Sequence, residues 1–205
     1  ATLKSASPVD PATIGPADLI DQLFPGNPLL CLGATKGSCR THPRSWWRGK
    51  ETHQQFIVPS PMSSVFGTAK HGKRSQRALS NTGPRVYLVV ECDFKPETLA
   101  HFGCTGSTFD LCAIVLSDLI KILPTCMVVH SGGKSLHSWH PCSGVPESQL
   151  RSFMEYAVSL GADRATWTRS QLVRMPNGLR DNGARQPVIF FNPSCLNLSV
   201  HPHFV

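Results

Sequence analysis

The stretch Val86-Tyr87-Leu88-Val89-Val90-Glu91-Cys92-Asp93 decides the fold. Its β-branched and aromatic residues predict a buried strand that ends in two acids. Because side chains alternate across a sheet, Glu91 and Asp93 are expected on one face and Cys92 on the other. Two carboxylates this close repel each other unless a cation lies between them, and oxygen ligands of this kind prefer Mg²⁺ or Mn²⁺. The alternative interpretation is a solvated strand end with two independent acids.

The residues after this strand predict a regular alternation of helices and strands. Apolar residues at three- and four-residue steps indicate one helix that ends at Pro124, and Gly161 ends a second. In chain order we predict a helix over 109–123, strands over 125–130 and 135–140, a helix over 146–160 and a strand over 187–191. With the first strand, this is the β-α-β-β-α-β order of the ferredoxin-like unit. In that topology the first and third strands pair, and the last strand lies beside the first.

The first 85 residues predict a smaller α/β unit, packed on the unit formed by 86–205 to make one domain. The expected fold class is therefore α/β of the α+β kind. A helix is predicted over 16–24, and strands over 29–32 and 56–58. Glycines mark 67–85 as a loop, and no acidic residue interrupts its run of positive charge. We expect this loop to contact a polyanion through Lys70, Lys73, Arg74 and Arg77.

The composition is that of a folded protein with a basic surface. Of the 205 residues, 40% are hydrophobic and 16% are charged, and the net charge of +7 favours a polyanionic partner. None of the eight cysteines has C-x-x-C spacing, which argues against a zinc ribbon and favours buried, reduced thiols in a cytoplasmic protein. No apolar run approaches the ~20 residues that span a bilayer, so no membrane partner is expected. A chain that starts at Ala1 rather than Met is expected to come from a larger protein with a helicase domain or subunit.

A glycine-containing turn precedes the third predicted strand. By alternation Ser135 and His137 share a face, and the topology places that face with the two acids of the first strand. The backbone at Gly132 and Gly133 can approach a ligand closely, and Lys134 is a flexible cation suited to phosphate. The turn therefore predicts a phosphate-binding element, and its alternative is a plain hairpin turn with a surface lysine.

Two other interpretations of this region are weaker. Gly133-Lys134-Ser135 is not a P-loop, because the first glycine of that motif would fall on Val128 and because the turn joins two strands. Zinc binding by His130, His137 and His140 is an alternative. Alternation places His137 and His140 on opposite faces of the strand, which prevents them from sharing one ion.

Further candidates follow the second predicted helix. Asp163 comes directly after the helix and is expected to enter beside the first strand, near Glu91 and Asp93. Arg174 and Arg180 flank a Pro-Asn-Gly turn, and their guanidinium groups can hold phosphate through two hydrogen bonds each. The alternatives are a helix-end aspartate without a role and solvent-exposed loop arginines.

Taken together, these segments resemble the archaeo-eukaryotic primase superfamily, in the branch found on bacterial, plasmid and viral replication proteins. The first strand with Glu91 and Asp93 is similar to the family's first motif, and 131–139 is similar to its Ser-x-His motif. Asp163, followed by 171–178, is similar to the third acid and the Arg-x-Pro-Gly-like segment. The resemblance covers about 86–192. It departs from the family in the Glu91 position, where Asp is commoner, and in the insertion of Asn177 before Gly178.

The resemblance implies template-directed joining of NTPs or dNTPs, as in a DNA primase or DNA polymerase, with single-stranded template and primer as partners. It implies that Glu91, Asp93 and Asp163 are catalytic and hold two Mg²⁺ or Mn²⁺ ions. The nucleotide would be bound by Lys134, Ser135, His137 and Arg174. Two alternatives from other classes stay open: a metal-dependent nuclease that uses the same acids, and a non-catalytic module that binds single-stranded nucleic acid.

Overall fold

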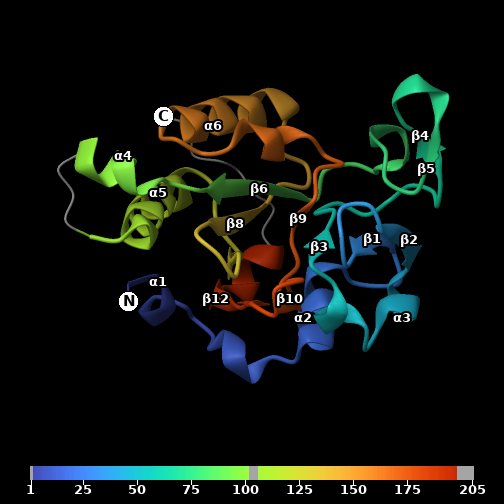
Figure 1. Ribbon diagram of the computed structural model, residues 1–205, viewed down its shortest axis with the longest axis horizontal. Coiled ribbons are helices and arrows are strands. Elements are labelled where there is room, and N and C mark those ends of the chain that lie inside the picture. Colours follow the sequence, from blue (N-terminus) through green and yellow to red (C-terminus); the bar gives the residue numbers. More distant parts are fainter. Residues whose placement is uncertain (1, 102–105, 198–205) are drawn as a thin grey trace.

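The computed structural model describes residues 2–101 and 106–197, which form antiparallel sheets with helices, an α+β architecture (Figure 1). The first part contains α1 (Thr2–Ser5), α2 (Pro16–Leu23), β1 (Leu29–Gly33), β2 (Arg40–Pro43), α3 (Arg44–Trp47), β3 (Phe56–Ile57), β4 (Gly67–Thr68) and β5 (Arg74–Ser75). The second contains β6 (Tyr87–Cys92), α4 (Pro96–His101), α5 (Thr108–Ile122), β7 (Met127–His130), β8 (Leu136–Pro141), α6 (Glu147–Ser159), β9 (Val173–Arg174), β10 (Gly178–Leu179), β11 (Arg185–Gln186) and β12 (Val188–Phe191). The helices and strands predicted after residue 85 are confirmed, with small shifts at their ends.

The sheet of the second part has the strand order β12-β7-β8-β6. The first and third strands of the predicted unit, β6 and β8, pair antiparallel with Glu91 opposite His137. That part of the ferredoxin-like prediction is confirmed. The placement of the last strand beside the first is wrong, because β12 pairs with β7 at the opposite edge, with Val188 opposite Val129.

The segment after α6 takes the place that was predicted for the last strand. Gly161 has a φ of +99°, which lets the chain reverse directly at the end of the helix. Ala162 then bridges Cys92, and the Asp163 N–H donates to the Glu91 carbonyl at 2.9 Å. Because this short segment occupies the β6 edge, β12 adds to the other edge of the sheet, beside β7.

Two different layers cover the faces of this sheet. Leu88, Val90 and Cys92 pack against α5 and α6, in a core that contains Leu116 and Phe153. The alternate residues of β6, Tyr87 and Val89, point the other way and pack with the first part of the chain, in a second core. Figure 1 shows α6 over one side of β6, with β1 to β3 on the side away from α5. Glu91 continues the row of Tyr87 and Val89, so it faces the N-terminal sheet.

The N-terminal sheet has the order β2-β1-β3-β9, and its last strand comes from the second part. Phe56 pairs with Arg174, and Ile57 with Val173. Conversely, a residue of the first part contacts the sheet of the second part: the Ser7 hydroxyl accepts the N–H of Phe191 in β12 at 2.8 Å. Two segments therefore cross the boundary predicted between residues 85 and 86.

The basic segment is more ordered than the predicted loop. β4 and β5 form an antiparallel hairpin within it, with Thr68 opposite Arg74. Asn81, in the short helical turn Leu79–Asn81, is buried and binds the chain on either side of the hairpin. The sequence did not predict this pairing, because the strands are only two residues long and the hairpin depends on a single buried asparagine.

The expectation of buried thiols is confirmed for seven cysteines, which are free and buried, while Cys104 lies outside the described residues. Within 2–101 and 106–197, every helix is too short or too polar to cross a bilayer.

His140 is buried between the sheet and the helices, and it makes the stability of the fold depend on pH. Its Nδ1 donates to the Leu123 carbonyl at 3.0 Å, its Nε2 lies 2.9 Å from the Ser138 hydroxyl, and its ring packs on Phe153. Burial lowers the pKa of His140 to about 4 despite the hydrogen bond to Leu123. Between pH 6.5 and 4 the unfolded chain therefore binds a proton that the folded chain excludes, so stability falls as the pH falls through this window.

We expect this group alone to remove about 2 kcal/mol of stability between pH 7 and pH 5. The variant His140→Gln should lack that contribution, and its free energy of unfolding should change less over the same range. Urea unfolding at pH 7, 6 and 5 measures the difference, with the exposed His53→Gln as control. Equal pH slopes for His140→Gln and the parent would contradict the assignment.

Candidate active site at the end of β6

One row of side chains crosses the edge of the sheet. Glu91 on β6 lies opposite His137 on β8. At the other edge of β6, Ala162 forms an antiparallel bridge with Cys92. The next residue, Asp163, therefore lies opposite Glu91 and donates its backbone N–H to the Glu91 carbonyl. Directly opposite residues of antiparallel strands point to the same face. The expected entry of Asp163 beside the first strand is therefore confirmed, as is the shared face of His137 and Glu91.

Glu91 is held by the two residues predicted from β8. The Ser135 hydroxyl donates to Glu91 Oε1 at 3.1 Å, and His137 Nε2 lies 3.4 Å from the same oxygen. Burial raises the pKa of Glu91, but the hydrogen bonds of His137 and Ser135 and the charges of His137 and Arg174 lower it more, to about 2. The carboxylate is therefore ionised at every pH near neutrality, although three quarters of it are shielded from solvent.

Asp93 is the more exposed of the two acids. Its Oδ1 lies 3.4 Å from the Lys134 ammonium, and the side chains are 34% and 64% exposed. An exposed ion pair of this kind contributes about 0–1 kcal/mol. Lys134 can therefore leave Asp93 for a phosphate at little energetic cost.

The Asp163 side chain has a local role in addition to its place beside β6. Its Oδ1 accepts the Ala165 N–H at 2.9 Å and caps the helical turn Arg164–Trp167. A carboxylate with one oxygen in a cap keeps its charge and a second oxygen for other contacts.

Arg174 reaches this site from the other sheet. Its Nη1 donates to Gln55 Oε1 at 2.7 Å, and its guanidinium lies 4.9 Å from the centre of the Phe56 ring. Burial and the charge of Arg180 lower the pKa of Arg174, while Glu91 opposes this effect. The mutual effect of Arg174 and Glu91 puts a cation of one sheet in electrostatic range of an acid of the other.

Arg180 and two glutamines also join the site, and the resemblance assigns no role to any of them. A Cβ added to Gly133 would lie 2.6 Å from Arg180 Nη1, so the arginine lies directly on the glycine turn. Gly132 has a φ of +70° and also leaves no space for a side chain, because a Cβ would lie 2.6 Å from the Arg185 carbonyl. From the sequence, Arg180 was expected only beside the Pro-Asn-Gly turn.

The two glutamines fix Arg174. Gln186 is fully buried, and its Nε2 donates to the carbonyls of Gln55 and Met175 at 3.0 Å. The Gln55 side chain in turn holds Arg174. The only signal in the sequence was a polar residue in or beside a predicted strand. The residues around Gln55 and Gln186 do not indicate that these two side chains meet.

A divalent cation fits the chemistry of the donors at the end of β6. Glu91 is ionised, and Asp93, two residues further along the chain, is a second oxygen donor. In this structure each acid has a basic neighbour: His137 Nε2 lies 3.4 Å from Glu91, and the Lys134 ammonium lies 3.4 Å from Asp93. Within the described ranges, no three His, Cys, Asp or Glu side chains already converge as a metal site.

The zinc alternative has no support in the described part of the chain. His137 faces Glu91, whereas His140 is buried on the opposite face of β8. His130 Nδ1 accepts the Gly132 N–H at 3.0 Å and shapes the turn.

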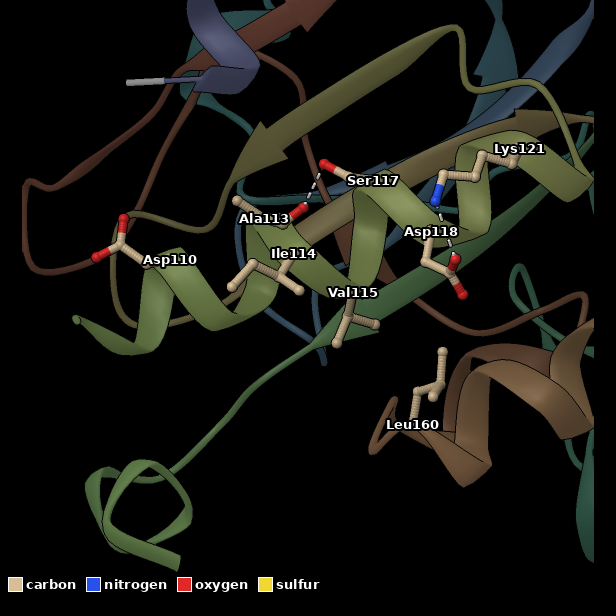
Figure 2. A pocket seen from close by; sticks show the side chains of 8 residues that line it. All are labelled: Asp110, Ala113, Ile114, Val115, Ser117, Asp118, Lys121 and Leu160. Atoms are coloured by element: carbon tan, nitrogen blue, oxygen red, sulfur yellow. Dashed lines mark hydrogen bonds and ion pairs between the residues drawn. The ribbon is translucent and has the colours of Figure 1, made fainter. Parts of the chain in front are cut away.

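A separate surface pocket of about 680 Å³ lies along α5 and includes Leu160 at the end of α6, but none of the site residues described above lines it (Figure 2). Its wall is mainly apolar, with Ile114, Val115 and Leu160. The two acids at its rim are already engaged: Asp110 caps α5, and Asp118 pairs with Lys121 at 3.3 Å. The pocket therefore offers no set of reactive groups.

The four basic residues of the β4–β5 segment lie elsewhere on the molecule. Figure 1 shows the hairpin at the upper right, whereas the arrow of β6 ends on the left, towards α4. Lys70, Lys73 and Arg74 are exposed, and Arg77 is half-buried. The structure does not bring them to Glu91, so they would contact a different part of any long polyanion.

The chain matches no family model, no curated protein and no solved structure. The functional argument therefore rests on the residues of this site.

Proposed function

We propose that this chain catalyses template-directed nucleotidyl transfer, as a DNA primase or DNA polymerase of the archaeo-eukaryotic primase type. One observation carries the proposal: Glu91, with His137 opposite it and the Asp163 backbone beside it, lies within electrostatic range of Arg174 from a second sheet. Carboxylates on one side and phosphate-binding groups on the other are what the transfer of a nucleotide from a triphosphate requires.

The acids would form the metal-binding side of the site. Glu91, Asp93 and Asp163 would hold two Mg²⁺ or Mn²⁺ ions, and such ions, when bound, lower the pKa of a 3′-hydroxyl and neutralise the triphosphate. Ser135 and His137 keep the Glu91 carboxylate in one orientation through contacts of 3.1 and 3.4 Å. This support reduces the reorganisation needed when the site is loaded.

The remaining groups would bind the triphosphate. Lys134 and Arg174 would neutralise its charge, and the backbone of the glycine turn would donate to its oxygens. His137 Nδ1 is buried and has no hydrogen-bond partner within the described residues. Because this nitrogen is closed off from solvent, His137 would reach a phosphate through its Nε2 edge, which faces Glu91 and Ser135.

A synthesis assay tests the proposal. The purified chain is incubated with single-stranded DNA, labelled NTPs or dNTPs, and Mg²⁺ or Mn²⁺, with and without a primer. New labelled chains that vanish with chelator support nucleotidyl transfer. Cleavage of labelled DNA in the absence of nucleotides would instead favour the nuclease. DNA binding with neither reaction, and without metal-dependent nucleotide binding, would favour a binding module.

Replacing His137 with alanine is expected to raise the apparent KM for the nucleotide by about 10- to 100-fold, because a hydrogen bond to a charged group contributes roughly 1.5–3 kcal/mol. Metal affinity, measured by Mn²⁺ titration, should change much less. The exposed His53→Ala variant is the control. Equal losses of metal and nucleotide affinity would show that His137 is a metal ligand.

A further inference from the structure

The β4–β5 hairpin and its flanking residues, 63–82, form a rigid projection, named here the basic hairpin. Asn81 is fully buried and ties it together: Nδ2 donates to the carbonyls of Ser64 at 3.0 Å and Gln76 at 3.2 Å, and Oδ1 accepts the Ala78 N–H at 2.8 Å. Gly67 packs so closely that a Cβ would lie 2.6 Å from Ser80 Oγ. The hairpin therefore has one defined shape.

The basic hairpin is also anchored to the N-terminal sheet. The Thr41 N–H donates to Gln76 Oε1, and its hydroxyl donates to the Gln76 carbonyl, both at 2.7 Å. Met62 bridges both Leu29 and Thr82 at the base of the projection. A ligand bound to the hairpin would be held at a fixed place relative to the rest of the chain.

This projection exposes apolar side chains that its own fold does not use. Six large hydrophobic side chains are exposed in the described residues, and three of them, Val65, Phe66 and Leu79, belong to the basic hairpin. Phe66 is 40% exposed, and the guanidinium of Arg74 lies 3.5 Å from the centre of its ring. An arginine stacked on an exposed aromatic ring is a flat surface to which a nucleic-acid base can add.

The charge around Phe66 is of one sign. Lys70, Lys73 and Arg74 are exposed, and within 2–101 and 106–197 none of them forms an ion pair with a carboxylate. Unpaired cations beside an exposed aromatic ring suit a strand that presents phosphates and unpaired bases together.

We propose that the basic hairpin binds single-stranded nucleic acid, with one base stacked on Phe66 and Arg74 and the neighbouring phosphates on Lys70 and Lys73. The partner class rests on the proposed function, while the stacking residue and the preference for unpaired bases go beyond it. Because the hairpin lies away from the end of β6 in Figure 1, the stacked base belongs to a part of the strand distant from the reacting nucleotide.

Binding of a fluorescent oligonucleotide, followed by anisotropy without metal or nucleotide, tests the stacking. Phe66→Ala should weaken the affinity for a single strand by about five- to twentyfold, the lower part of the range for loss of one stacked base. Its affinity for duplex DNA and for an abasic strand of equal length should stay within twofold of the parent. Phe66→Trp should restore binding. The control is Tyr156→Ala, since Tyr156 is an aromatic residue of equal exposure on α6.

The cations and the ring are expected to have separable effects. Combined substitution of Lys70 and Lys73 by glutamine should reduce the slope of log affinity against log salt by roughly 0.7 for each phosphate that is no longer neutralised. Phe66→Ala should leave that slope unchanged, because stacking releases no counterions.

Several results would overturn the inference. One is equal loss of single-strand, duplex and abasic-strand binding in Phe66→Ala, and another is no loss at all. Phe66-dependent binding to anionic phospholipid vesicles without binding to DNA would identify a membrane surface as the partner instead. A chain that fails to synthesise but shows the Phe66 pattern would refute the proposed function and leave this inference standing. Synthesis together with unchanged DNA binding in Phe66→Ala would support the proposed function and refute this inference.

Discussion

Replacing Asp93 with alanine is expected to lower nucleotide incorporation by at least about a thousandfold, which corresponds to about 4 kcal/mol of transition-state stabilisation. The fold should not suffer, because Asp93 is a third exposed and contacts Lys134 in an exposed ion pair at 3.4 Å. Such a pair contributes about 0–1 kcal/mol to stability.

The matched control is Asp118→Ala. Asp118 forms a similar exposed ion pair, with Lys121 at 3.3 Å, but lies on α5 away from the site. Incorporation rates with saturating template and metal, together with thermal melting, should separate the two variants by activity and not by stability. If Asp93→Ala incorporates nucleotides as fast as Asp118→Ala, Asp93 holds no catalytic metal and the proposed reaction must be carried by other residues.

The substitution Glu51→Ala is expected to destabilise the fold by about 3–5 kcal/mol, because it leaves a buried charge without its partner. The Arg44 side chain is 3% exposed and lies 2.6 Å from Glu51, which is 2% exposed, and 2.6 Å from Asp21. These contacts join α3, the turn at residue 51 and α2. Without Glu51, the guanidinium of Arg44 retains only the half-exposed Asp21 and the Ala17 carbonyl.

Thermal unfolding measures this effect. For a chain of this size, 3–5 kcal/mol corresponds to a fall in Tm of roughly 10 °C. Glu155→Ala, at an exposed position of α6, should change stability by no more than about 0.5 kcal/mol. A Tm for Glu51→Ala within about 2 °C of that control would mean that Arg44 reaches solvent or another acid and that the buried pair does not stabilise the fold.

Much of the second part of the fold follows from patterns that are local in the chain. The alternation of apolar residues before Glu91 specifies a buried strand, and it places Glu91 and His137 on faces that can meet. Helix α5 is bounded by the Ser107 cap and Pro124, and α6 ends at Gly161. These signals are readable because each depends on residues within one turn or one strand.

The structure of the basic hairpin could not be predicted from local sequence patterns. Its charge was visible in the sequence, whereas its rigidity depends on Asn81, whose partners lie as far as 17 residues away in the chain. The exposure of Phe66 could not be predicted either, because an aromatic residue in an irregular segment is as readily buried as exposed. Only the packing of residues 63–82 against β2 left that ring in solvent.

Helices α2, α5 and α6 and strands β6, β7, β8 and β12 could be predicted from the sequence, since periodicity and turn residues act locally, and the order of these elements predicted the pairing of β6 with β8. Three features follow only from the tertiary structure: β12 lies beside β7, β9 completes the N-terminal sheet, and Arg174 comes within electrostatic range of Glu91. These relations join residues more than 50 positions apart. They are selected by which apolar surfaces can be buried together and by which segment occupies each strand edge, and neither condition is written in any short stretch of the chain.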